Sequence, residues 1–239
     1  MPSRWIPISP WTNTPSFLNQ NWAISASFWI HLPTAGARHF YASAMTLLRK
    51  TQSEGTSYLE LAQFIRAQGD AAHADADLAQ LFRRVVFNVA IGNRDDHLRN
   101  HGFVLGKTGW RLAPAFDVNP NIDKAEHVLN IDDVDNRPNL ETVLGTAAFY
   151  GLGDGAARQI AAEVAAVVDE WRDSARRAGI AGADIDLTAG AFSAHTEFRA
   201  ATSKQDGCDV ERVMGIEPTL EAWEAAVLPL NYTRIEGNR

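Results

Sequence analysis

The stretch LFRRVVFNVAIGNRDDHLRNHGFVL, residues 81–105, divides into three parts of different composition. Its first part continues a run in which apolar side chains recur every three or four residues from position 78 to position 89, which predicts a buried helix face. Its middle, residues 92–101, concentrates aspartates, histidines and arginines. Its end, GFVL, is predicted to form a strand that pairs with a second strand, WRLA, across a glycine-bounded turn at 106–109. The stretch therefore predicts a helix, a polar loop and a β-hairpin in that order.

The loop has a spacing with chemical meaning. Asp95 is followed by four residues and then Asn100, which is the spacing of the catalytic base and a metal ligand in protein kinases. A second carboxylate follows the hairpin, Asp117, in the run AFDV. Mg²⁺ prefers hard oxygen donors, which an amide, a carboxylate, phosphate groups and water supply together. We therefore expect Asp95 to act as the base and Asn100 and Asp117 to bind Mg²⁺.

Flanking segments complete a mainly helical α+β body at about residues 37–199. We expect helices at 37–50 and 57–69, and a long helix capped by Asp75 or Asp77 that leads into the polar loop. A further helix is expected at 155–177, stopped by Gly179, and another after Asp184. Residues 1–34 show neither a helical nor a strand period, so no element is predicted there.

Composition limits the classes of function. The 239 residues carry 22 lysines and arginines against 29 aspartates and glutamates, a net charge of -7. This charge argues against direct binding of nucleic acid, and no run is apolar enough for a membrane span. Cys208 is the only cysteine, so an intramolecular disulfide and a cysteine-based zinc site are both excluded. A cytoplasmic location is expected.

Longer motifs resemble one family. SAMTLL, SYLELAQFIR, LFRRVVFNVAIGNRDDHLRNHGFVL and GWRLAPAFDVNP are similar to the C-terminal domain of the HipA family of toxin serine/threonine kinases. The resemblance implies a protein-kinase-like C-lobe, a helical domain with a small β-hairpin at the active site, over residues 36–198. It also implies Asp95 as the catalytic aspartate, Asn100 and Asp117 as Mg²⁺ ligands, ATP as the cofactor, and a helix-turn-helix antitoxin as partner.

Other residues of the loop admit more than one interpretation. We assign His97 and Arg99 to cofactor binding, although a loop arginine is often solvated or structurally paired. His97 and His101 stand four apart, as helical metal ligands do, but glycine and strand follow at once, so we do not assign them to a metal. Asp96 could replace Asp95 as the base, but only Asp95 has the correct spacing to Asn100. The acidic run at 132–136 is interpreted as a solvated turn.

Two kinase features are missing from the sequence. No glycine-rich loop precedes Asp95, and the only lysine before it is Lys50. We therefore expect a chain that lacks the nucleotide-covering lobe, with residues 1–35 irregular and out of frame. Residues 199–239 contain GIEPT, which resembles translation of the strand opposite a transfer-RNA gene, so we expect a read-through tail.

Three functions follow from these observations. The first is a HipA-like serine/threonine kinase of a type II toxin-antitoxin system, using ATP and Mg²⁺ through Asp95, with weak activity at most in this truncated form. The second is an inactive kinase remnant that acts as a binding module. The third is a metal-dependent hydrolase built on the aspartate and histidine cluster.

Overall fold

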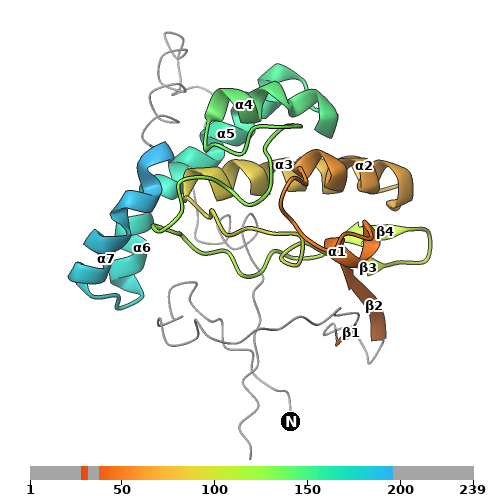
Figure 1. Cartoon of the computed structure of the whole chain (residues 1–239), viewed down its shortest axis with the longest axis horizontal. Coiled ribbons are helices and arrows are strands. Elements are labelled where there is room, and N and C mark those ends of the chain that lie inside the picture. Colours follow the sequence, from red (N-terminus) through yellow and green to blue (C-terminus); the bar gives the residue numbers. More distant parts are fainter. Residues whose placement is uncertain (1–27, 32–37, 196–239) are drawn as a thin grey trace, which may run out of the picture.

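Helix α3, Ala74–Ala90, runs through the centre of the molecule (Figure 1). The computed structural model describes residues 28–31 and 38–195. The apolar stripe of α3 is buried, and the helix packs against α2 Tyr58–Gln68, α4 Leu140–Gly145, α5 Asp154–Asp169 and strand β4 Trp110–Leu112. Each fully buried Leu, Val or Phe side chain contributes roughly 1.5–3 kcal/mol. The helix predicted from periodicity is therefore the central element of the core.

The start of α3 differs from the prediction. The cap is His73 instead of Asp75 or Asp77, and Asp70 organises the preceding turn by accepting the backbone N–H of Ala72 at 2.9 Å. Asp77 has another role, because both of its carboxylate oxygens accept N–H groups of Arg111, at 2.9 and 3.0 Å. The predicted capping residue instead ties the helix to the hairpin.

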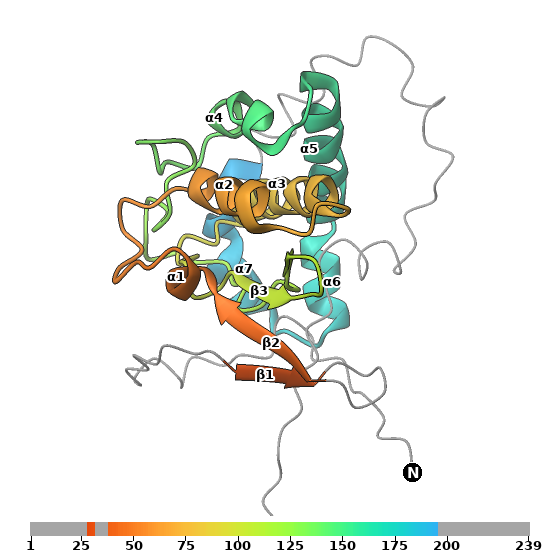
Figure 2. The ribbon, with the colours of Figure 1, turned by 90° about the vertical axis from the view of Figure 1, so that its right-hand side faces the viewer.

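A four-stranded antiparallel sheet lies along one side of the helices, in the order β1-β2-β3-β4 (Figures 1 and 2). The register sets Tyr41 opposite Val104 and Phe103 opposite Leu112. Phe64 of α2 covers the sheet, with its ring centroid 4.8 Å from that of Phe103. The strands are β1 Phe28–His31, β2 Arg38–Ser43, β3 Gly102–Leu105 and β4 Trp110–Leu112.

Two predictions near the N-terminus are wrong. Residues 37–50, predicted as one helix, form β2 and then only a short helix, α1 Ala44–Leu47. Pairing with β3 overrides the local helical pattern, and Ser43 ends the strand by capping α1, where its hydroxyl accepts the N–H of Thr46 at 3.4 Å. Residues 1–34 were predicted to hold no element, yet Phe28–His31 is strand β1.

The remaining helices follow their predicted positions with one break. The single helix expected at 155–177 is two helices, separated at Glu170, where the backbone leaves the helical conformation. The break lets Trp171 stack on Phe192, with ring centroids 4.0 Å apart and planes within 4° of parallel. Gly179 follows the end of α6 with φ of 80°, as expected for a glycine that stops a helix. These helices are α2 Tyr58–Gln68, α4 Leu140–Gly145, α5 Asp154–Asp169, α6 Trp171–Arg177 and α7 Gly182–Thr188, with 3₁₀ turns η2 Ala147–Tyr150 and η3 Ala189–Phe192.

The predicted α+β, mainly helical fold class is confirmed. Helix α7 starts at Gly182, two residues before the Asp184 that was expected to precede it. Among the described residues, no helix is both long and apolar enough to cross a membrane. The tail predicted at 199–239 lies outside the described residues, and the predicted domain limits stay predictions.

Candidate functional site

The polar loop joins the end of α3 to the first strand of the hairpin. Gly92 opens it with φ of 65°, and a Cβ at this position would lie 2.2 Å from the backbone oxygen of Ala191. Only glycine fits both the left-handed backbone and this close approach. The carbonyl of Gly92 accepts the N–H of Asn121 at 2.9 Å. The loop is therefore held between η3 and the chain segment that follows Asp117.

Asp96 is the buried centre of the loop. Its Oδ2 accepts hydrogen bonds from the Tyr58 hydroxyl at 2.6 Å and the Asn88 amide at 2.7 Å, and it pairs with His101 Nε2 at 2.8 Å. The side chains of Asp96 and His101 are each only 3% exposed, which excludes solvent from the pair. A network of this kind fixes the loop to α2 and α3 and ties its two ends together.

Electrostatics explain why this buried carboxyl stays charged. Burial alone would raise the pKa of Asp96, but His101 and the hydrogen bonds from His101 and Tyr58 outweigh it and lower the pKa. Burial first, and the charge of Asp96 second, raise the pKa of Tyr58 well above its ordinary value. Both shifts favour the arrangement in which the Tyr58 hydroxyl donates to a charged Asp96 carboxylate.

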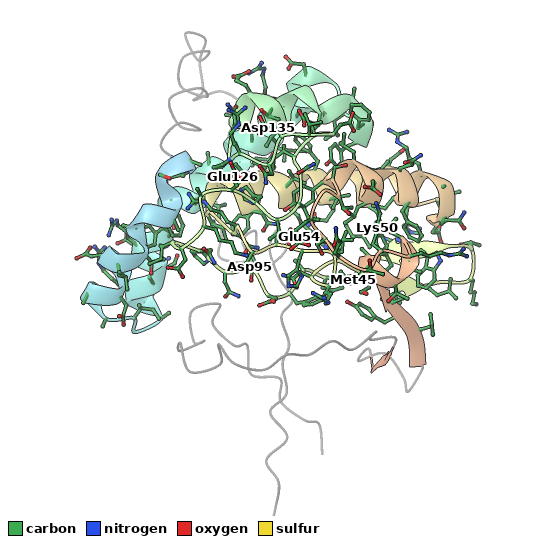
Figure 3. All side chains as sticks on the ribbon, viewed as in Figure 1. Met45, Lys50, Glu54, Asp95, Glu126 and Asp135 are labelled. Carbon is green, nitrogen blue, oxygen red and sulfur yellow. The ribbon has the colours of Figure 1, made fainter. Side chains whose placement is uncertain are left out.

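Asp95, the next residue, lies in the opposite environment. Its side chain is 57% exposed and pairs with the ammonium group of Lys124. Figure 3 shows Asp95 on the loop, well apart from Lys50. Of the two adjacent aspartates, Asp95 is thus the one that a molecule in solution can reach.

Lys124 reaches Asp95 from a rigid turn. The side-chain oxygen of Asn121 accepts the N–H groups of Asp123 and Lys124, at 3.0 and 2.9 Å. Arg94, which is buried, donates to the carbonyls of Asn121 and Lys124, at 3.3 and 2.7 Å. The loop and this turn therefore form one unit.

The two predicted metal ligands lie on either side of the hairpin. Asn100 is buried at the end of the loop, where its N–H donates to the carbonyl of His97 at 2.8 Å. The hairpin returns the chain so that the Ala113 N–H donates to the Gly102 carbonyl at 2.9 Å, four residues before Asp117. Asp117 has φ of 55°, an uncommon conformation outside glycine that often marks functional positions.

Negative charge gathers around Asp117. The residue is partly open to solvent, yet desolvation of its carboxyl by the surrounding protein is the largest cause that raises its pKa. His97 lowers the pKa, whereas the charges of Asp95 and Asp96 raise it further. The carboxyl is thus within electrostatic range of the loop, where a cation would relieve the repulsion.

The donor set fits Mg²⁺ better than a softer metal. Among residues 40–195, no group of three or more His, Cys, Asp or Glu side chains is arranged to hold a metal ion. Asn100 and Asp117 would supply two hard oxygen donors, and Mg²⁺ commonly takes its remaining ligands from phosphate groups and water. The two residues would hold the ion, which would neutralise charge on a bound phosphate.

The other predicted residues lie on the same loop. His97 is partly buried and Arg99 is exposed. The buried Nδ1 of His97 has no hydrogen-bond partner. His127 is also buried close to the loop, near the backbone of Asn93, but neither of its ring nitrogens completes a hydrogen bond. Burial, followed by the charge of Arg94, lowers the pKa of His127 to about 4, although Asp96 acts in the opposite direction.

Comparisons with known proteins agree with the fold. The family model of the HipA-like C-terminal domain matches residues 27–171. A Haemophilus influenzae protein described as "Putative kinase" is 38% identical over 65 residues, which cover 26% of this chain and 18% of that protein. HipA of Shewanella oneidensis MR-1, solved in complex with HipB and operator DNA, superposes with a TM-score of 0.57 at 13% identity, over 76% of this chain and 49% of HipA.

The fold and the family match agree on the kind of domain that is present. A mainly helical α+β lobe, with a charged loop between its central helix and its sheet, is the class that the fold defines. The chain belongs to the family of HipA-like C-terminal domains, and so contains a kinase-related domain. The matched regions span less than half of the curated relative and of the solved HipA chain.

Sequence reasoning missed the supports of the loop. Tyr58, Asn88, Arg94 and Lys124 were not predicted to belong to the site. Asn88 gave a signal, because it interrupts the buried part of an apolar helix just before the loop. Lys124 gave none, since it follows a segment without helical or strand periodicity.

Proposed function

We propose that this chain is the catalytic lobe of a HipA-like serine/threonine protein kinase. In this proposal, Asp95 accepts the proton of the substrate hydroxyl, Asn100 and Asp117 bind Mg²⁺, and His97 and Arg99 contact the cofactor, ATP. The substrate oxygen bonds to the γ-phosphorus, the bond from that phosphorus to the bridging oxygen breaks, and ADP leaves with the electron pair. Mg²⁺ supplies charge neutralisation to the phosphates.

The observation that carries the proposal is the contrast between two adjacent aspartates. Asp96 is buried and bonded to three side chains, so it fixes the loop and is not accessible to a substrate. Asp95 is exposed on the fixed loop, and the carboxyl of Asp117 lies within its electrostatic range. Phosphoryl transfer depends mainly on positioning and electrostatics, which such an arrangement favours.

The toxin role and the partner rest on family likeness. The Shewanella protein is part of a toxin-antitoxin system and was solved with HipB on operator DNA. We extend this to a helix-turn-helix antitoxin that binds the present chain in the cytoplasm. We assign no direct contact with nucleic acid to this chain.

A non-catalytic binding module is the second candidate. One observation favours it: none of the strands β1 to β4 carries a lysine. Protein kinases pair the nucleotide phosphates with a strand lysine. We therefore expect transfer by this chain to be slow.

The test measures transfer of labelled γ-phosphate to a library of serine- and threonine-containing peptides. Transfer that is slow but lost in Asp95→Asn, while Asp186→Asn retains it, supports the kinase. Asp186 is a matched control because it is an exposed aspartate paired with Arg172 at 3.2 Å, on α7. A lack of transfer together with MgATP binding would favour the binding module.

A separate measurement tests the metal ligands. Mn²⁺ can be titrated as a spectroscopic substitute for Mg²⁺ into the wild type and into the double variant Asn100→Ala with Asp117→Ala. We expect the double variant to lose most of the affinity. Equal affinity in both proteins would contradict the metal assignment.

A further inference from the structure

Lys124 combines a fixed backbone with an accessible charge. Its N–H and its carbonyl are both hydrogen-bonded, to Asn121 and to the buried Arg94 respectively. Its side chain, in contrast, is 44% exposed and ends at Asp95. The turn at residues 121–124, which is hydrogen-bonded to the loop through Arg94, therefore holds the ammonium group next to Asp95.

The pair with Asp95 contributes little to folding. Exposed ion pairs typically change an equilibrium constant by less than about fivefold, because water solvates both partners well. The pair can therefore exchange for another anion at small cost, whereas the backbone hydrogen bonds of the turn keep the lysine in place.

The charges around Lys124 indicate which anion could replace Asp95 as its partner. Asp95, Asp96 and Asp117 are all within electrostatic range of one another at the loop. A phosphate chain approaching these carboxylates needs compensating positive charge beyond Mg²⁺. Lys124, which already lies beside Asp95, is positioned to supply this charge.

We propose that Lys124 binds the terminal phosphoryl group of a nucleoside triphosphate, an inference that rests on the proposed kinase function. In the free protein the ammonium group pairs with Asp95. When the triphosphate binds, Lys124 donates its N–H groups to the non-bridging oxygens of the γ-phosphate and releases the carboxylate of Asp95 to accept the hydroxyl proton. No covalent bond to Lys124 forms or breaks.

The experiment follows the accessibility of Lys124 in the full chain. Surface amines are acetylated briefly, and the modification of each lysine is quantified by mass spectrometry, with MgATP, MgADP or magnesium tripolyphosphate present. Lys50 is the control, because it is a partly exposed lysine in an ion pair with Glu60 at 2.7 Å, well apart from Asp95 (Figure 3). We expect MgATP and magnesium tripolyphosphate to slow acetylation of Lys124 several-fold, MgADP to have little effect, and Lys50 to be unchanged.

Binding measurements with variants complete the test. Lys124→Ala should weaken MgATP binding by about tenfold, the range expected for one charge-assisted hydrogen bond near solvent. It should leave MgADP binding and the urea midpoint unchanged. Lys124→Arg should restore most of the MgATP affinity, and Lys50→Ala should behave as wild type.

The results separate an error in the assignment of Lys124 from a failure of the proposed kinase function. If MgATP binds but Lys124 remains fully reactive, or if Lys124→Ala binds MgATP as well as or better than wild type, the lysine assignment is wrong and the kinase proposal stands. If neither MgATP nor magnesium tripolyphosphate binds the wild-type chain, both proposals fail.

Discussion

Replacing each of the two adjacent aspartates by alanine should give very different losses of stability. Asp96→Ala removes an acceptor from the Tyr58 hydroxyl, the Asn88 amide and His101 Nε2, all of which are buried. Each buried polar group left without a partner costs about 1–3 kcal/mol, and breaking a buried ion pair costs about 3–5 kcal/mol in total. We expect a loss of about 4 kcal/mol, a large part of the ~5–15 kcal/mol that stabilises a typical domain.

Asp95→Ala serves as the matched comparison. Its carboxylate is 57% exposed and its ion pair with Lys124 is open to water, so the expected loss is about 0–1 kcal/mol. Urea unfolding followed by circular dichroism measures both losses on the same chain. Equal losses for the two variants would refute the assignment of Asp96 as a buried structural centre and Asp95 as an accessible residue.

A second pair of variants keeps the test usable if Asp96→Ala does not fold. Tyr58 and Tyr150 are both fully buried, but only the Tyr58 hydroxyl is bonded to a carboxylate. The Tyr150 hydroxyl has no well-formed partner, since the nearby Thr146 hydroxyl donates to the Val143 carbonyl. Tyr58→Phe should therefore cost about 2 kcal/mol and Tyr150→Phe close to none. The reverse order would contradict the network.

Three further predictions concern the loop and its surroundings. Gly92→Ala should destabilise the protein by several kcal/mol in urea unfolding, because the backbone has φ of 65° and the new Cβ would clash with the backbone oxygen of Ala191. Gly155→Ala in α5 is the control: it has open space around it and should be neutral or stabilising by about 0.5–1 kcal/mol. Between pH 6.5 and about 4, His127 is protonated in the unfolded chain but not in the folded protein. The free energy of unfolding should therefore fall by about 3 kcal/mol as the pH is lowered through this window. Urea midpoints measured across the window should show this fall, and His127→Gln should remove most of it. Affinity for Mn²⁺ should decrease as the pH is lowered towards the raised pKa of Asp117, because the proton competes with the metal; a titration series that shows no pH dependence would contradict this.

The sequence predicted the elements in which local pattern and tertiary packing agree. The apolar stripe of α3 and the glycine-bounded hairpin turn both appear in the structure, since burial of one face and turn chemistry act over a few residues. Residues 38–43 show the opposite case. Their sequence is compatible with a helix, but hydrogen bonding to β3 selects a strand, and no local pattern encodes a partner about 60 residues away.

In the candidate site, too, local features could be found in the sequence, whereas contacts between distant residues could not. The spacing of Asp95 and Asn100 is local and was found in the sequence, although their roles stay predictions. The contact between Asp95 and Lys124 joins residues 29 apart through an irregular segment, so it has no period to detect. The different environments of Asp95 and Asp96 depend on which one meets Tyr58, and this is decided only by the packing of α2 against α3.

The contact between Gly92 and Ala191 has a practical consequence for fragment design. The family match ends at residue 171, and an expression fragment cut at that boundary would remove η3, the backbone against which Gly92 is seated. It would also remove Phe192, on which Trp171 stacks. A shortened version intended for crystallisation or ligand screening should therefore extend at least through residue 195. Otherwise the loop bearing Asp95 would lose the η3 backbone against which it packs.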